Sequence, residues 1–252
     1  METREPLTAL FNTHHDARRL QATALLMLAL LYGQVALVVM AWLPAWSLLL
    51  TAPVWVVRWM LATHELFHLR TQDEVDVLTR LMPLLLSPLS IGYREHLVMH
   101  RGHHRCMASP EDPEYFQLRG NRLVGFLNAL TAPEQGFLRW IAAHGVDAAL
   151  MRGAAVRAVL FVALIWAMGP LFFWYWLPIR LAHAAAFFSF FYMLHRRGEA
   201  FGVYPMHFTP AVSRLYAVLF GREALLATCH HDLHHAHPRV GALRLPQLRD
   251  SP

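Results

Sequence analysis

The stretch "QATALLMLALLYGQVALVVMAWLPAWSLLLTAPVWVV" (residues 21–57) contains no charged side chain. A helix needs about 20 predominantly apolar residues to cross the hydrocarbon core of a bilayer. The stretch is therefore long enough for two crossings, and "LPAW" (43–46) is a suitable place for a tight reversal between them. These residues predict a membrane-spanning helical hairpin over about residues 21–63.

A second apolar region covers residues 158–194 and is interrupted by "GP" (169–170), Pro178 and Arg180. Prolines and a charge suit a reversal better than the middle of a crossing, so this region predicts a second hairpin over about residues 156–195. Only 15% of the residues are charged, against about a quarter in an average soluble domain. The predicted fold is therefore all-α: one membrane-bound domain over residues 1–252, with four transmembrane helices in two hairpins and a cytoplasmic helical cap.

Three shorter apolar segments lie outside the hairpins. The segment "LMPLLLSPLSIGY" (81–93) is too short to cross a bilayer as a helix and contains two prolines, so we expect it to be re-entrant or interfacial. We expect the same of residues 123–142 and 213–229, where apolar residues recur near helical spacing among arginines.

The basic residues predict the orientation of the chain in the membrane. The formal charge is +5, and most arginines fall on one side of the predicted hairpins, which the positive-inside rule makes cytoplasmic. Arg180 alone would belong to an outer turn. We therefore expect a multi-pass protein, in a bacterial inner membrane, with both termini cytoplasmic. The N-terminal 20 residues lack the features of a secretory signal, so the first apolar segment should remain in the mature protein. Anionic lipid and nucleic acid both attract arginines, but the mean hydropathy of +0.32 favours lipid and argues against nucleic acid.

Histidines gather in three clusters that would all lie on this cytoplasmic face. The clusters are "HELFH" (64–68), "HRGHH" (100–104) and the end of "CHHDLHH" (229–235). In each cluster the spacing i, i+3 or i+4 places imidazoles on one face of a helix. So many desolvated imidazoles would be costly without a partner, and their number exceeds the ligands of one tetrahedral zinc. The clusters predict a site for two metals, for which imidazole suits iron, zinc, copper or nickel.

Two other functions fit part of this pattern. "HELFH" is also the HExxH signature of zinc metalloproteases, in which Glu65 would act as the base of an intramembrane protease. That function leaves the other two clusters without a role. A metal transporter should carry its polar residues at membrane depth, whereas these lie beyond the helix ends.

The three clusters together resemble the histidine boxes of the membrane-bound fatty acid desaturase superfamily, which also includes alkane hydroxylases and carotenoid ketolases. "EDPEYF" (111–116) and "HPRVGALRLPQL" (237–248) are similar to segments that follow the second and third boxes in that superfamily. The resemblance implies two non-haem irons held by His64, His68, His100, His103, His104, His195, His231, His234 and His235. Further ligands that it suggests are His96, His207 and His230. Carboxylates that could hydrogen-bond the ligand imidazoles are Glu65, Glu95, Asp112 and Asp232, each of which could equally be a solvated surface charge.

The resemblance also implies the chemistry. A protein of this kind would use O2 as co-substrate to remove hydrogen from an unactivated C–H bond of a lipid acyl chain, with fatty acid desaturation as the first expectation. Hydroxylation or ketolation of an alkane, fatty acid or carotenoid is the alternative. The sequence contains no flavin fingerprint and only two cysteines, so electrons must come from a separate donor such as ferredoxin, rubredoxin or a b-type cytochrome with its reductase.

Overall fold

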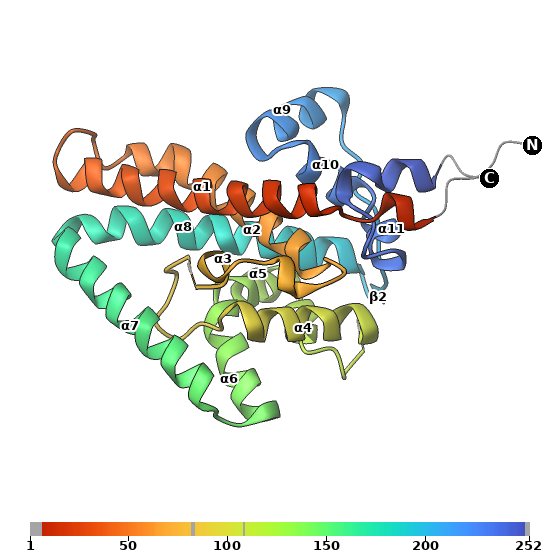
Figure 1. The fold of residues 1–252 in the computed structure, drawn as a ribbon, viewed down its shortest axis with the longest axis horizontal. Helices are drawn as coiled ribbons and strands as arrows, with labels where there is room; N and C mark the ends of the chain where they lie inside the picture. The colour runs from red at the N-terminus through yellow and green to blue at the C-terminus, as the bar shows by residue number, and fades with distance from the viewer. Residues whose placement is uncertain (1–6, 82–83, 108, 250–252) are drawn as a thin grey trace, which may run out of the picture.

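The first hairpin consists of α1 (His14–Val39) and α2 (Ser47–Phe67), which lie side by side in the computed structural model (Figure 1). The structure describes residues 7–81, 84–107 and 109–249. Thr13 and Asp16 form a capping box that starts α1, and residues 40–46 make the reversal near the predicted "LPAW". The Gln34 amide joins the two helices, because it donates to Ser47 Oγ (3.0 Å) and accepts from Thr51 Oγ1 (2.6 Å).

The second hairpin reverses at "GP", where Gly169 has φ 51° and ends α7 (Ala148–Met168). After the 3₁₀ turn Gly169–Leu171, α8 (Phe172–Phe187) returns beside α2 and continues as a π-helical turn, η5 (Phe188–Met193). The predicted place of Arg180 in an outer turn is wrong: Pro178 and Arg180 lie inside α8. Arg180 is buried there because it forms an ion pair with Glu134 and donates to the Leu86 carbonyl (3.4 Å).

Helix α7 also begins earlier than the predicted hairpin. The side chain of Asp147 caps it by accepting from the Leu150 amide (2.7 Å). As a result, Arg157 falls in the middle of α7 rather than at its start.

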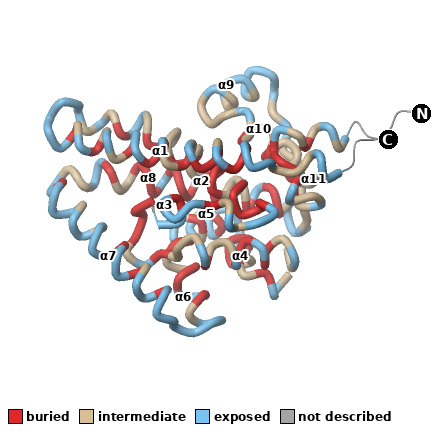
Figure 2. Tube along the Cα trace, in the orientation of Figure 1, coloured by how far each residue is buried: buried red, intermediate tan, exposed pale blue. Residues whose placement is uncertain are grey.

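The apolar core between the hairpins also encloses part of the predicted re-entrant or interfacial segment (Figure 2). Residues 84–92 are not helical, and Leu84 and Leu86 are buried against α1, α2 and α8. Side chains satisfy the backbone here: Tyr175 donates to the Leu85 carbonyl (3.2 Å) and Trp176 Nε1 to the Leu86 carbonyl (3.0 Å). Irregular backbone is tolerated inside an apolar bundle only when it is paired in this way.

Two helical runs within the described residues are long and apolar enough to cross a membrane. They are His14–Val39 and Ala148–Met193, the second of which includes the turn after Gly169. Helix α2 carries Arg58, His64 and Glu65 and is not one of them. The arrangement with four crossings stays a prediction.

The remaining elements build the cap, and they confirm the all-α class. Residues 123–142 form α5 and α6, and residues 213–229 form most of α9 and α10, which separate at Gly221 (φ 99°). The only strands among the described residues are the two-residue β1 and β2, paired antiparallel. The helices of the cap are α3 (Val77–Leu81), α4 (Tyr93–Cys106), α5 (Arg122–Leu130), α6 (Ala132–His144), α9 (Pro210–Phe220), α10 (Arg222–Cys229) and α11 (His231–Ala236), with β1 at Arg196–Arg197 and β2 at Ala200–Phe201. Short 3₁₀ helices cover Leu7–Leu10, Gln72–Glu74, Tyr115–Leu118 and Ala242–Leu248.

The segments before α1 and after α11 pair with each other. Phe11 and Val240 form an antiparallel bridge, and the Gly241 amide donates to the Leu10 carbonyl (3.1 Å). Arg244 reinforces the pairing through an ion pair with Asp16 (2.8 Å). The third histidine box is thereby fastened to the start of the first hairpin.

Candidate metal centre

The first box lies at the end of α2. His64 is in the last turn and His68 is the C-terminal cap residue, so the helix places their ring centroids 5.0 Å apart. Glu65 between them is buried, and its Oε2 accepts from the Ala242 amide (3.2 Å) while its Oε1 lies 3.4 Å from His64 Nδ1. The glutamate therefore links the first box to the segment that follows the third.

The second box occupies the last turns of α4. His100 and His103 are buried on the face that meets α2, and His104 follows them. Glu95 was expected to bind an imidazole, but the structure places it at the other end of this helix. There it accepts from the Gly92 amide (2.9 Å) and from Arg94 (2.8 Å), as an acidic residue in the first helical turn commonly does.

The third box lies on α11, where His231 and His234 are buried and His235 is half-buried. Asp232 lies on the same helix, but its carboxylate pairs with Arg249 (2.9 Å) rather than with an imidazole. The expectation that Asp232 would orient a ligand is corrected accordingly.

His195 follows the π-helical turn η5. Its Nδ1 lies 2.9 Å from the Phe191 carbonyl, so this nitrogen donates and Nε2 keeps its lone pair. That Nε2 lies 3.0 Å from His235 Nε2 and 3.3 Å from His231 Nε2. π-Helical turns often occur at functional sites, and here the turn directs an imidazole at the third box.

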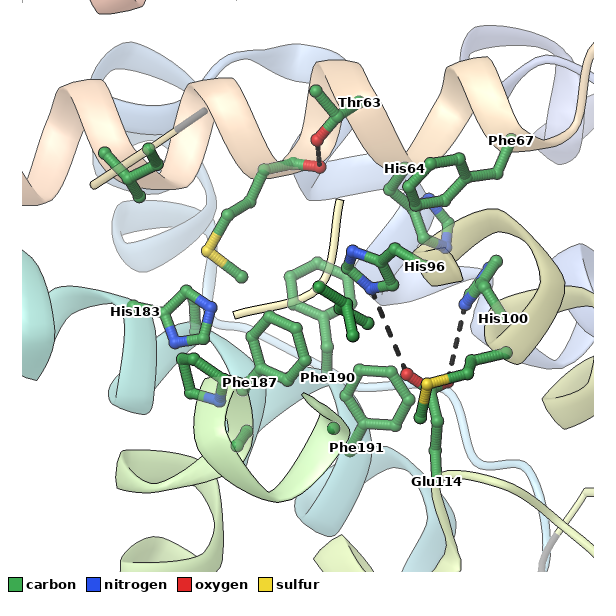
Figure 3. Close-up of a pocket in the computed structure, with 18 of the residues that line it drawn as sticks. Thr63, His64, Phe67, His96, His100, Glu114, His183, Phe187, Phe190 and Phe191 are labelled. Carbon is green, nitrogen blue, oxygen red and sulfur yellow. Dashed lines mark hydrogen bonds and ion pairs between the residues drawn. The ribbon is translucent and has the colours of Figure 1, made fainter. Parts of the chain in front are cut away.

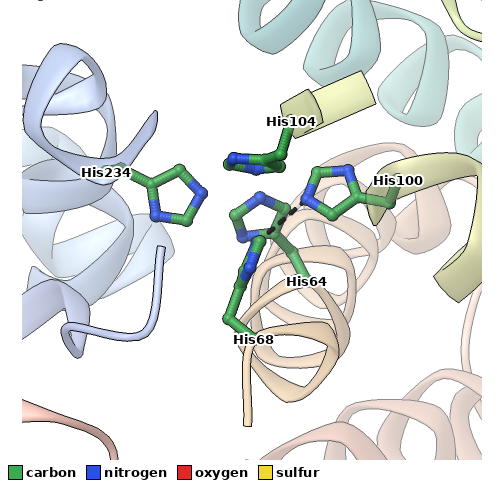
Figure 4. A group of neighbouring side chains, drawn as sticks. All are labelled: His64, His68, His100, His104 and His234. Carbon is green, nitrogen blue, oxygen red and sulfur yellow. Dashed lines mark hydrogen bonds between the residues drawn. The ribbon is translucent and has the colours of Figure 1, made fainter. Parts of the chain in front are cut away.

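The histidines from all three boxes and His195 meet in two groups. In each group the nitrogen atoms lie within 4.8 Å of one another, which suits one metal ion per group. The first group is drawn in Figure 4 and consists of His64, His68, His100, His104 and His234. The second consists of His103, His195 and His235. His231 stands beside the second group, with its ring centroid 4.8 Å from that of His195.

The two groups adjoin. The rings of His104 and His235 stack across the boundary with centroids 4.1 Å apart, and the ring centroids of His103 and His104 are 5.8 Å apart. Two metals bound here would therefore be neighbours, as the number of histidines predicts.

Carboxylates stand behind several imidazoles. Asp112 Oδ2 lies 2.8 Å from His103 Nδ1. Glu114 Oε2 lies 3.6 Å from His100 Nδ1, and its Oε1 lies 4.0 Å from His96 Nε2. Sequence reasoning missed Glu114, although its position two residues after Asp112 in "EDPEYF" was a signal that could have found it.

None of the suggested further ligands belongs to either group of described residues. His96 lies one turn before His100 and faces a cavity beside the centre (Figure 3). His207 is exposed, and His230 forms the boundary between α10 and α11. The structure thus brings nine of the twelve named histidines together.

Burial controls the protonation of these groups. It holds the pKa of His100 and His234 well below the ordinary value, and neighbouring imidazoles lower it further. Burial also raises the pKa of Glu114 well above its usual range. The imidazoles of His100 and His234 are therefore neutral near pH 7, which is the form that binds a metal.

Unpaired nitrogens show that the site fits a metal. Both ring nitrogens of His104 and of His234 are buried without a hydrogen-bond partner among the described residues. His68 Nε2 and His100 Nε2 face each other at 2.9 Å. A metal ion would satisfy such lone pairs, and an imidazole set backed by carboxylates suits iron, zinc, copper or nickel.

An apolar cavity with a volume of about 180 Å³ reaches the centre. His100, His103 and His195 form part of its wall, and Phe187, Phe190 and Phe191 form another part (Figure 3). At another part of the wall the cavity meets Gly92, the N-terminal cap residue of α4, and Arg157 of α7. Arg157 is a second residue that sequence reasoning missed, because it lay at the edge of the predicted hairpin.

Comparison with curated proteins and with solved structures gives no significant match. The model of the fatty acid desaturase family matches residues 40–251, which include every histidine of both groups. A match over most of the chain, together with the histidine boxes that the structure assembles, shows that this protein belongs to the fatty acid desaturase family.

Proposed function

We propose that this protein is an O2-dependent, non-haem di-iron oxidoreductase that acts on a lipid acyl chain, with fatty acid desaturation as its first expected reaction. The observation that carries the proposal is the pair of adjoining histidine groups at the wall of an apolar cavity. Two bound irons would supply the activation of O2 and the removal of hydrogen from an unactivated C–H bond, which no side chain can do as a base.

The protein itself supplies positioning. His64, His68, His100, His104 and His234 would hold one iron, and His103, His195, His231 and His235 the other. Asp112 fixes the tautomer of His103, and the Phe191 carbonyl fixes that of His195. The phenylalanines of the cavity exclude water and align an apolar chain beside the histidines.

Hydroxylation and ketolation remain alternatives, because they share these parts and differ in where the substrate C–H bond is held. A zinc protease is less well supported. Its base, Glu65, accepts from the buried Ala242 amide, and its two histidine ligands share a group with three further imidazoles. A protease has no use for those additional ligands.

We further propose a multi-pass arrangement in which both hairpins cross the inner membrane of a bacterium and the histidines lie on the cytoplasmic side. The apolar runs Ala148–Met193 and His14–Val39 support it. A separate electron donor, such as ferredoxin, rubredoxin or a b-type cytochrome with its reductase, would dock on the arginine-rich cytoplasmic face.

The first experiment is to measure the metal content of the detergent-purified protein by mass spectrometry after expression with both iron and zinc. A content close to two irons per chain would support the proposal. The lipids of expressing cells are then analysed, and new double bonds, hydroxyls or ketones distinguish the three reactions. Close to one zinc per chain, with unchanged lipids, would contradict it and direct attention to Glu65→Gln.

A further inference from the structure

Arg157 carries a buried charge that the metal centre does not use. The residue is only 7% exposed in the middle of α7, and its Nε and Nη2 have no hydrogen-bond partner among the described residues. A buried ionised group without hydrogen bonds costs several kcal/mol, on the order of the whole stability of a domain. An ionisable residue within a candidate membrane helix therefore points to a functional site whose partner has to be found.

Glu95 is a charged neighbour of Arg157, but it does not fill the hydrogen bonds of the guanidinium. The negative charge of Glu95 acts on Arg157. Both oxygens of Glu95 are already engaged, one by the Gly92 amide and the other by Arg94. Glu95 therefore leaves Nε and Nη2 of Arg157 without a hydrogen-bond partner among the described residues.

These two nitrogens form one edge of the guanidinium. Their N–H groups point the same way and match the two oxygens of a carboxylate in a bidentate pair. The third nitrogen, Nη1, faces Gly92, where even a Cβ atom would come within 3.2 Å of it. Glycine at this position gives the guanidinium the room it occupies.

The side chain of Arg157 forms part of the wall of the cavity that reaches the histidines. Arg157 and Gly92 line the cavity together with His100, and Ile91, Met99 and Phe187 contribute to the wall. Gly92 caps α4 and His100 lies eight residues further along it, which corresponds to about 12 Å at 1.5 Å per residue. An apolar chain anchored at Arg157 would therefore pass along α4 to the metal centre.

We infer that Arg157 binds the carboxylate of the substrate, so that the substrate is a free fatty acid rather than an acyl thioester or an acyl group esterified in a lipid. The buried position of Arg157 supports this choice, because a headgroup bound there has to be small. This inference rests on the proposed function and narrows it to one substrate class.

Binding without turnover tests the inference. The iron-loaded protein is placed in phosphatidylcholine nanodiscs under argon without a reductant, and binding of radiolabelled palmitate, methyl palmitate and hexadecyl phosphate is measured. The variants are Arg157→Gln, Arg157→Lys and the control Arg152→Gln, which changes an exposed arginine of the same helix.

Wild-type protein should bind palmitate at least tenfold more tightly than methyl palmitate. Arg157→Gln should lose that preference and keep its affinity for the ester. Arg157→Lys should show an intermediate preference, because an ammonium group lacks the two parallel N–H groups that match a carboxylate. The control Arg152→Gln should match wild type. Equal binding of acid and ester by wild type, or an undiminished preference in Arg157→Gln, would overturn the inference. Tighter binding of hexadecyl phosphate than of palmitate would overturn the choice of a carboxylate.

The comparison of ligands on wild type needs no variant, so the test survives if Arg157→Gln does not fold. Its failure is also distinct from that of the proposed function. If palmitate binds through Arg157 to a protein that holds no iron, the inference stands and the oxygenase proposal is rejected. If the protein holds two irons and modifies lipids but binds palmitate no more tightly than methyl palmitate, the oxygenase proposal stands and the inference is rejected.

Discussion

Asp112 Oδ2 lies 2.8 Å from His103 Nδ1, and neither side chain is more than 1% exposed. The second oxygen of Asp112 accepts from the Glu114 amide (2.8 Å), so the carboxylate is held while it orients the imidazole. A carboxylate in this position fixes the tautomer of a metal ligand and increases its basicity.

Asp112→Asn should therefore weaken iron binding by about 10- to 100-fold while the helices stay folded. The measurement is iron retained during titration with a chelator, with circular dichroism as the check on folding. Asp232→Asn is the matched control, because Asp232 pairs with Arg249 and not with a histidine. Equal loss of iron in both variants would show that the His103 contact has no special role.

His103→Ala should remove a ligand of the second group and abolish oxygenase activity without disrupting the hairpins, since His103 lies in the cap on α4. Metal content by mass spectrometry and product formation are the two measurements. His207→Ala changes an exposed histidine outside both groups and should behave as wild type. Full iron content and normal turnover in His103→Ala would contradict the assignment.

Acid should destabilise the metal-free protein. Burial lowers the pKa of His96 to about 4, whereas in an unfolded chain it is about 6.5, so the unfolded state binds more protons between these values. The contribution of such a histidine to the free energy of unfolding is fully present above pH 6.5. It falls towards pH 4, by up to about 1.4 kcal/mol per pH unit for each such histidine.

Glu114 acts in the opposite direction, because its raised pKa makes the folded state bind the extra proton. Melting temperatures of the chelator-treated protein between pH 7.5 and 5 should decrease, and they should decrease more steeply in Glu114→Gln. A melting temperature that rises on acidification would contradict this account.

Arg180→Gln should destabilise the protein by roughly 3 kcal/mol, the lower end of the range for losing one partner of a buried ion pair. The reason is that the buried side chain of Arg180 would lose both its ion pair with Glu134 and its hydrogen bond to the Leu86 carbonyl. Arg249→Gln breaks a more exposed pair and should cost less than about 1 kcal/mol. Denaturant unfolding of the two variants provides the comparison.

The proposed topology places two exposed sites on opposite sides of the membrane. In a Cys106→Ser, Cys229→Ser background, Trp42→Cys in the first reversal should react with an impermeant maleimide from outside the cell. Glu199→Cys, in the turn between β1 and β2, should react only after the membrane is opened. Labelling of both sites from the same side would contradict the proposed topology.

Local patterns predicted much of this structure. The uncharged stretch 21–57 located the first hairpin, and helical spacing placed His100, His103 and His104 on one face, because both signals depend only on nearby residues. The ion pair between Arg180 and Glu134 could not be foreseen, since its partners lie on separate helices. Glu114 and Arg157 were missed because their importance comes from burial, which is decided by packing between segments that are distant in the sequence.

The first histidine group joins residues 64 and 234, and the segment after the third box is in turn clasped by residues 10–16. During synthesis the first histidine group cannot be completed until the ribosome has added His234. Chains that end before the third box would leave the imidazoles of the first two boxes without the ligands that α11 supplies. A metal can therefore be bound by the complete first group only after the third box has folded against the first two, and iron supplied late would bind molecules in which residues 10–16 already pair with residues 239–244.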